Sequence, residues 1–132
     1  MILHVVDITS GGTSGPSLDE ALAELDNNMH GSVVGDVMPE EIARMFLAAG
    51  WSARKSSWTE YEVRHRFAEI EFYRDQHGVT GFHGVVDPER LTALADQFTS
   101  LGLACSIELY GPDGQTLLRE LQVDGRDAAH QE

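Results

Sequence analysis

The sequence predicts an α+β protein, in which two to three helices pack on one face of an antiparallel sheet of about five to six strands. Two observations favour this class. Amphipathic helical patterns closed by glycine are interspersed with short runs in which apolar and polar residues alternate. Turn sequences at 65–66, 76–78 and 111–114 reverse the chain between such runs. Helices on one side of an antiparallel sheet form an α+β layer architecture.

The first part of the chain predicts a strand, a loop and a helix. Residues 1–8 are rich in aliphatic and β-branched residues, which are typical of strands. After a loop of small residues, Ser17 and Glu20 have the spacing of a helix capping box. Three leucines follow at helical spacing, namely Leu18, Leu22 and Leu25. A short strand is expected at 32–34, and the first strand and helix can add to the main sheet.

Two longer helices share the same boundary signals. Pro39 suits the first position of one helix, and Gly50 is placed to end it. Asp87 is expected to cap the other helix before Pro88, and Gly102 to close it. The predicted helices cover 39–49 and 88–101, with apolar stripes at Ile42, Met45, Phe46 and Ala49, and at Leu91, Leu94, Ala95, Phe98 and Leu101.

Six further runs predict strands, at 51–54, 59–64, 67–73, 79–86, 103–110 and 115–123. The apolar side chains fall on odd positions up to Val63 and on even positions from Ala68. A strand cannot switch faces without a turn or bulge, so the chain must reverse near residues 65–66. We therefore expect one domain over 1–123 and a polar tail over 124–132.

The composition is strongly acidic, with 22 Asp and Glu against 9 Lys and Arg and a net charge of −13. The first 43 residues hold eight acids and no Lys or Arg. Such a chain repels nucleic acid and anionic membranes, and it attracts basic protein surfaces. The single cysteine, Cys105, excludes an intrachain disulfide, and its strand pattern predicts a buried thiol. With no signal peptide or membrane span visible, we expect a cytoplasmic protein.

No motif in the sequence indicates catalysis, a cofactor or a metal. The glycine-rich loop at 11–15 lacks the lysine of a nucleotide-binding P-loop. The six histidines have no spacing typical of zinc ligands, and no nucleophile elbow is present. We therefore expect that the protein is not an enzyme.

The hairpin at 59–73 gives the first prediction of a binding surface. A two-residue turn at 65–66 places Glu62 opposite Glu69 and Glu60 opposite Glu71 on the solvent face. Like charges directly opposite each other destabilise a sheet by up to about 1 kcal/mol per pair, so this stack indicates a basic partner. The alternative is a solvated face with a slipped register, or one that is neutralised by nearby arginines, namely Arg64, Arg66 and Arg74.

Aromatic and helical residues extend this surface. Trp58 and Tyr73 are expected at turn or outward positions, and an exposed aromatic among acids is typical of a binding hot spot. The alternative for both is a covered position at the sheet edge. The predicted partner-binding set is Glu60, Glu62, Glu69, Glu71, Trp58, Tyr73, Asp19, Glu20 and Glu24.

Two segments carry a resemblance to a known kind of protein, namely EYEVRHRFAEIEFYRDQHGVTGFHGVVDPERL and LACSIELYGPDGQTLLREL. In size, charge and strand–helix order, the chain resembles the small acidic immunity proteins of bacterial toxin systems. The resemblance implies a non-catalytic bacterial inhibitor whose acidic residues block the basic groove of a toxin, for example a nuclease, through a protein–protein interaction.

Three other functions remain open from the sequence. A phage-type DNA mimic, such as an anti-CRISPR or anti-restriction protein, needs the same acidity. A small ligand-binding or enzymatic domain needs a pocket between sheet and helices. A homodimer needs an open sheet edge that pairs with its symmetry mate.

Overall fold

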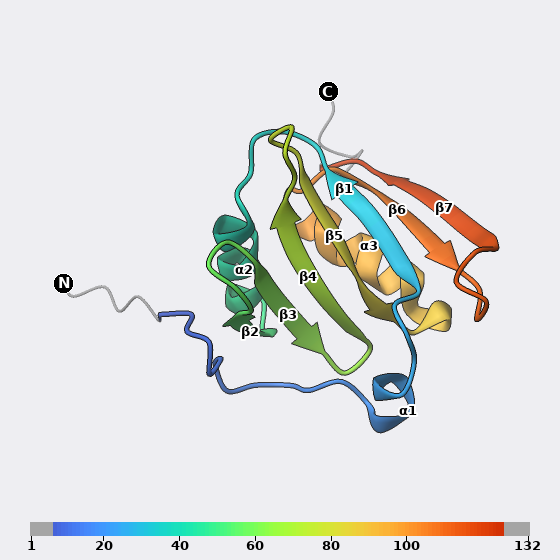
Figure 1. Ribbon diagram of the computed structural model, residues 1–132, viewed down its shortest axis with the longest axis horizontal. Helices are drawn as coiled ribbons and strands as arrows, with labels where there is room; N and C mark the ends of the chain where they lie inside the picture. The colour runs from blue at the N-terminus through green and yellow to red at the C-terminus, as the bar shows by residue number, and fades with distance from the viewer. Residues whose placement is uncertain (1–6, 126–132) are drawn as a thin grey trace.

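The computed structural model describes residues 7–125, and within them the chain forms a seven-stranded antiparallel sheet with helices (Figure 1). This confirms the α+β class, with slightly more strands than predicted. The strands are β1 (Met29–Val33), β2 (Ser52–Lys55), β3 (Tyr61–His65), β4 (Ala68–Arg74), β5 (Thr80–Val86), β6 (Cys105–Tyr110) and β7 (Leu117–Val123). The helices are α1 (Glu20–Ala23), α2 (Pro39–Ala48) and α3 (Leu91–Ser100), and a 3-10 turn, Pro88–Arg90, precedes α3. The strand order is β2-β3-β4-β5-β1-β6-β7.

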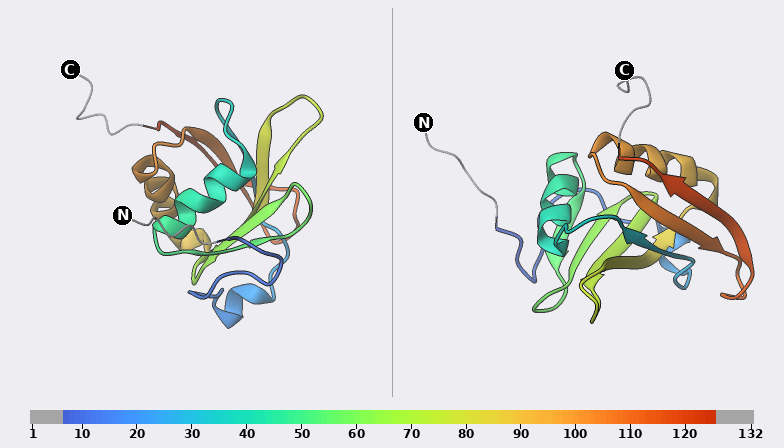
Figure 2. Two further views of the ribbon diagram at one scale, coloured as in Figure 1. Left: turned by 90° about the vertical axis from the view of Figure 1, so that its left-hand side faces the viewer. Right: turned by 90° about the horizontal axis from the view of Figure 1, so that it is seen from above.

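Helices α2 and α3 cover one face of the sheet, and the core lies between them and the strands (Figure 2). Phe46 of α2 and Phe98 of α3 meet over the sheet with their ring centroids 5.5 Å apart. Phe72 and Phe82 complete this aromatic centre, and all four side chains are fully buried. The opposite face of the sheet has no described helix lying along its strands, and we call it the open face.

The predicted boundaries of both long helices are confirmed. Pro39 occupies the first turn of α2, and Asp87 caps the turn before α3 by accepting a hydrogen bond from the Glu89 backbone N–H. Gly50 and Gly102 follow the two helices with φ of 98° and 75°. Residues other than glycine rarely adopt such backbone angles, so these two glycines end the helices as expected.

The strand expected at 32–34 is longer and lies at the centre of the sheet, between β5 and β6. Its Gly31 packs against both neighbours. A Cβ atom there would lie 2.2 Å from the Ser106 carbonyl oxygen and 2.3 Å from the Phe82 ring. Glycine therefore permits the close approach of β1 to its partners.

The first helix is much shorter than predicted. Asp19, rather than Ser17, occupies the position before α1, and Leu25, expected in the helix, lies beyond its end and is 45% exposed. The reason is tertiary: the Asp19 N–H donates to the Arg66 carbonyl, and the buried Asn28 side chain bonds both polar backbone groups of Val86. These anchors leave room for only one helical turn. The strand predicted at 1–8 lies largely outside the described residues, and Asp7 and Ile8 are not in a strand.

The 59–73 hairpin forms, but its predicted register is wrong by two residues. Glu62 lies opposite Glu71, Arg64 opposite Glu69, and His65 opposite Ala68. The turn therefore falls at 66–67, where the Phe67 ring packs near the Trp51 and His65 rings. A shift of two keeps every side chain on its predicted face, and it exchanges a repulsive Glu–Glu pair for an attractive Arg–Glu pair.

The two edges of the sheet differ. At the β2 edge, the N-terminal segment runs alongside the strand: the Thr13 N–H donates to the Ala53 carbonyl, and the Lys55 N–H donates to the Thr9 carbonyl, both at 2.9 Å. At the other edge, β7 pairs with β6 on its inner side and with no described residue on its outer side. One edge is thus protected by the chain itself, and the other is open.

Candidate protein-binding surfaces

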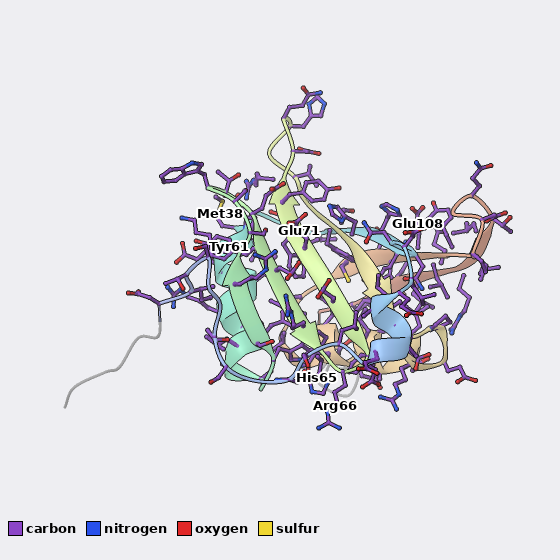
Figure 3. The ribbon with its side chains drawn as sticks, turned by 60° about the horizontal axis from the view of Figure 1, so that its bottom comes forward. Met38, Tyr61, His65, Arg66, Glu71 and Glu108 are labelled. Atoms are coloured by element: carbon purple, nitrogen blue, oxygen red, sulfur yellow. The ribbon has the colours of Figure 1, made fainter. Side chains whose placement is uncertain are left out.

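The open face carries charged and aromatic side chains from all seven strands. They are Arg54, Glu62, Arg64, Glu69, Glu71, Tyr73, His83, His30, Glu108, Tyr110 and Glu120. Figure 3 labels Glu71, on β4, and Glu108, on β6 across the middle of the sheet. The sequence correctly placed Glu62, Glu69 and Glu71 together on this face.

These glutamates do not form the exposed acidic patch that the sequence predicted. The Glu62 side chain is only 13% exposed, and its carboxylate accepts hydrogen bonds from Arg54 Nε at 2.9 Å and from Arg64 at 2.7 Å. Arg64 Nε also lies 3.4 Å from Glu69. The predicted alternative, neutralisation by arginines, describes this half of the open face, with Arg54 in the place of Arg66 and Arg74.

The two central carboxyls respond oppositely to this environment. Burial would raise the pKa of Glu62, but hydrogen bonds from Arg64 and Arg54 outweigh it, and the pKa is lowered. For Glu69, burial and the nearby charge of Glu62 raise the pKa above its usual value. The fold therefore stabilises the ionised form of Glu62 and destabilises the ionised form of Glu69.

The other half of the open face is aromatic. His83 on β5 lies 3.3 Å from Glu71, and its ring is 5.4 Å from that of Tyr73, which is half-buried. His30 on β1 packs edge-on against Tyr110, whose hydroxyl donates to Glu108 at 3.0 Å. Glu71 and Glu108 in this half are thus also engaged with neighbouring side chains, whereas Glu120 of β7 lies opposite Glu108.

The remaining hairpin residues lie at the β2–β3 connection. Trp58 is 91% exposed, and the Lys55 ammonium lies 5.7 Å from its ring centroid. Glu60 immediately precedes β3, where its backbone N–H bonds the Ser57 hydroxyl. The sequence correctly placed Trp58 in a turn, whereas Glu60 belongs to the connection rather than to a row of glutamates along the strand.

The α1–β1 connection and the β6–β7 turn lie at the lower right of the ribbon in Figure 1. A groove of about 450 Å³ is lined by residues of these two segments. We call it the acidic groove. Leu25 and Leu118 line it and are 45% and 53% exposed. Its other lining residues are Glu24, Asp26, Asn27, Asn28, Pro88, Tyr110, Gly111, Pro112, Asp113 and Gly114. An apolar floor with three carboxylates and no lysine or arginine among its lining residues is suited to a cationic, partly apolar ligand.

Both walls of the acidic groove are fixed by hydrogen bonds. Asn28 anchors the α1–β1 wall to β5 through its two bonds with Val86. In the opposite wall, the Asp113 carboxylate accepts from the backbone N–H groups of Gln115 and Thr116 at 2.9 Å. Hydrogen bonds from the Thr116 side chain and from these two backbone groups lower the pKa of Asp113 to about 2. This carboxylate is thus ionised at neutral pH, which suits charge recognition rather than proton transfer.

Only part of the predicted set comes together at this groove. Glu24 lines it, and Asp19 and Glu20 lie at the start of the same short helix. The sequence identified the Gly111–Gly114 turn and the helical spacing of Leu25, but not the meeting of that turn with residues 24–28. The remaining predicted residues lie on the open face or at the β2–β3 connection.

Among the residues that the structure describes, no cluster of three or more His, Cys, Asp or Glu side chains is arranged to hold a metal ion. None of the described helices has the length and apolar character needed to cross a membrane. Comparison of the chain with protein-family models, curated proteins and solved structures found no match.

Proposed function

We propose that this chain is a non-catalytic acidic protein that binds and inhibits a basic protein partner. The version we favour is a cytoplasmic immunity protein that neutralises a cognate bacterial toxin. The observation that carries the proposal is the acidic groove, in which Leu25 and Leu118 are exposed between Glu24, Asp26 and Asp113. This surface combines apolar area with a single sign of charge.

The groove supplies both parts of a binding energy. Burying apolar surface contributes roughly 25 cal/mol per Å², so covering the two leucines favours association. The surrounding carboxylates select a lysine or arginine beside the apolar contact, and the net charge of −13 accelerates encounter with a basic surface. A partner segment with an apolar side chain flanked by basic residues fits this arrangement.

The open face is a weaker candidate for the contact. Glu62 and Glu69 already form ion pairs with Arg64, and Glu71 lies 3.3 Å from the His83 ring. A partner would have to break these pairs before it gained new ones, and replacing one ion pair by another brings little net energy. The carboxylates of the acidic groove are therefore better placed to bind a basic partner.

The test uses the protein encoded beside this chain's gene as the partner. Its binding to the full chain is measured by stopped-flow fluorescence and by loss of its toxic activity. We expect Asp26→Lys to slow association by about fivefold or more, because rim charges act mainly on the association rate. Asp96→Lys, an equal charge reversal on the exposed side of α3, is the control and should slow it much less.

Two results would contradict inhibition of this partner, and a third would contradict the site of contact. A neighbouring protein that binds but keeps its full activity would exclude inhibition. If the protein encoded by the adjacent gene does not bind at low salt, where electrostatic attraction is strongest, it is not the partner of this chain. Equal slowing by Asp26→Lys and Asp96→Lys would place the contact outside the acidic groove.

A further inference from the structure

The outer edge of β7 is an open hydrogen-bonding surface in a sheet whose other edge is covered. Thr9 and Thr13 run along β2, whereas no described residue pairs with the outer side of β7. Unpaired edges offer rows of N–H and C=O groups to another strand, and proteins commonly cover or shorten them. β7 has seven residues, and all except Leu121 and Val123 are exposed.

Space for an added strand exists beside this edge. A groove of about 430 Å³ runs between α3 and β7, lined on the helix by Thr92, Ala95 and Thr99. These small side chains leave Leu121 partly uncovered at the edge of the core. An additional strand could therefore insert its helix-side residues next to Leu121 without displacing α3.

We propose that a second copy of the chain pairs with this edge, β7 against β7 in antiparallel orientation, with Leu121 opposite its symmetry mate. A two-fold axis perpendicular to the sheet continues the sheet and pairs residues on the same face. The axis therefore passes between one residue of β7 and the same residue of the second copy. The charges of the strand decide which residue this is.

Three central positions can be compared. An axis at Arg119 places two arginines opposite each other, and an axis at Glu120 places two glutamates opposite each other. Each such pair costs up to about 1 kcal/mol, in a protein whose copies already repel through their net charge. An axis at Leu121 brings two leucines together and sets Glu120 opposite Gln122 of the second copy, where they can hydrogen-bond. This register is the one without a direct like-charge pair.

This dimer is independent of the proposed inhibitor function. Because the paired strands run antiparallel, the β6–β7 turns of the two copies lie at opposite ends of the interface. Leu118, which lines the acidic groove, is outside the 119–123 pairing. Each copy therefore keeps its groove open, and the assembly presents two of them.

Sedimentation equilibrium of the full chain tests the proposal. We expect a dimer at about 100 µM, a concentration that half-populates even a contact with a Kd of that order. Gln122→Lys should tighten the dimer about threefold or more, because it sets an ammonium group opposite Glu120 at both symmetry-related positions. Gln122→Glu should weaken it by a similar factor. Gln122 is exposed, so both variants should keep the fold, which circular dichroism checks.

Two controls separate the register from net charge. Asp7→Asn changes the net charge as Gln122→Lys does, but at an exposed position in the segment that leads to the opposite, β2 edge of the sheet, and should change the Kd by less than about twofold. Under mild oxidation, Leu121→Cys should form a disulfide-linked dimer in higher yield than Glu120→Cys, because only position 121 faces itself. A folded chain that stays monomeric at this concentration would overturn the proposal. A dimer that is indifferent to both Gln122 variants, or is linked best through position 120, would also overturn it.

Discussion

Glu62 and Glu69 are neighbours on the open face, yet ionisation affects the fold in opposite directions at the two positions. The pKa of Glu62 is lowered in the folded state, so its charge contributes stability above its usual pKa of about 4.5, and this stability is lost as the pH falls. The pKa of Glu69 is raised, so its charge destabilises the fold at neutral pH, and protonation relieves that cost. The bonds to Arg54 and Arg64 account for the difference.

A matched pair of substitutions tests this contrast. Glu62→Gln should lower the free energy of unfolding at pH 7 by about 1 kcal/mol, because two charge-assisted hydrogen bonds become weaker. Glu69→Gln should leave it unchanged or raise it slightly. Urea unfolding at pH 7 and pH 3 provides the measurement, and the cost of Glu62→Gln should shrink at pH 3. Equal losses for the two variants at pH 7 would contradict the assignment.

Cys105 is expected to be chemically inert in the native protein. Its side chain faces the core on β6 with 1% exposure, and burial raises the pKa of its thiol to about 12. The thiolate is the reactive species, so both access and ionisation are suppressed. A chromogenic thiol reagent should label the native chain slowly and the urea-unfolded chain at once. Rapid labelling under native conditions would contradict the buried position.

At the scale of the elements, β1 depends on the absence of a side chain at Gly31. A methyl group there would meet the Ser106 carbonyl oxygen and the Phe82 ring well inside contact distance. We expect Gly31→Ala to cost more than about 2 kcal/mol, since neither the backbone nor the buried ring can move away. Gly11→Ala is the control, because its nearest contact would be a flexible hydroxyl at 3.8 Å, and it should cost little. Thermal unfolding of both variants gives the comparison.

The β2–β3 connection should be dispensable for folding. Trp58 is 91% exposed, whereas Trp51 is 2% exposed and packs against Phe46. Trp58→Ala should therefore change the free energy of unfolding by less than about 0.5 kcal/mol. In Trp58→Phe, the emission of the remaining Trp51 should shift to shorter wavelength and resist acrylamide quenching. A large loss of stability in Trp58→Ala would show that the connection packs on the fold.

Local chemistry explains which elements the sequence could predict. Pro39, Gly50 and Gly102 fix helix ends through backbone constraints within a few residues, so both long helices fall where expected. The alternation of apolar residues likewise locates the strands. The hairpin register and the length of α1 depend on Phe67 meeting Trp51 and on Asn28 meeting Val86. Each of these contacts joins residues that are far apart in the sequence, so no pattern within one short segment can indicate it.

For the whole molecule, the acid excess should make the fold sensitive to salt. The net charge of −13 repels itself most strongly in the compact state. Raising the ionic strength from about 0.01 M to about 0.1 M shortens the screening length from about 30 Å to about 10 Å. We expect the thermal midpoint at pH 7 to rise over this range. A fall would show that the Glu62 network outweighs the general repulsion.

The acidic character of the candidate site could be predicted from the sequence, but its position in the fold could not. Composition correctly indicated an acidic surface, and Glu24 belongs to it. The position of the acidic groove depends on the β6–β7 turn meeting the segment after α1, which brings Asp113 near residues far away in the sequence. In the sequence, the closely spaced glutamates of the hairpin indicate a binding surface more strongly than the residues of the acidic groove do. Arg54, on the neighbouring strand β2, pairs with Glu62 and offsets its charge, a contact that the hairpin sequence does not contain.

The place of β1 in the sheet affects how the chain can be made. This strand is synthesised early, yet His30 lies opposite His83 on one side and Glu108 on the other. While the ribosome is still adding the last third of the protein, β1 lacks at least one of its neighbours. The strands β2 to β5 lie in the sheet in the order in which they follow one another in the chain, so their mutual pairs are local and can form first. β1 therefore gains its second neighbour only after β6 has emerged, and the nascent chain must keep Met29 and Val33 from other apolar surfaces until then.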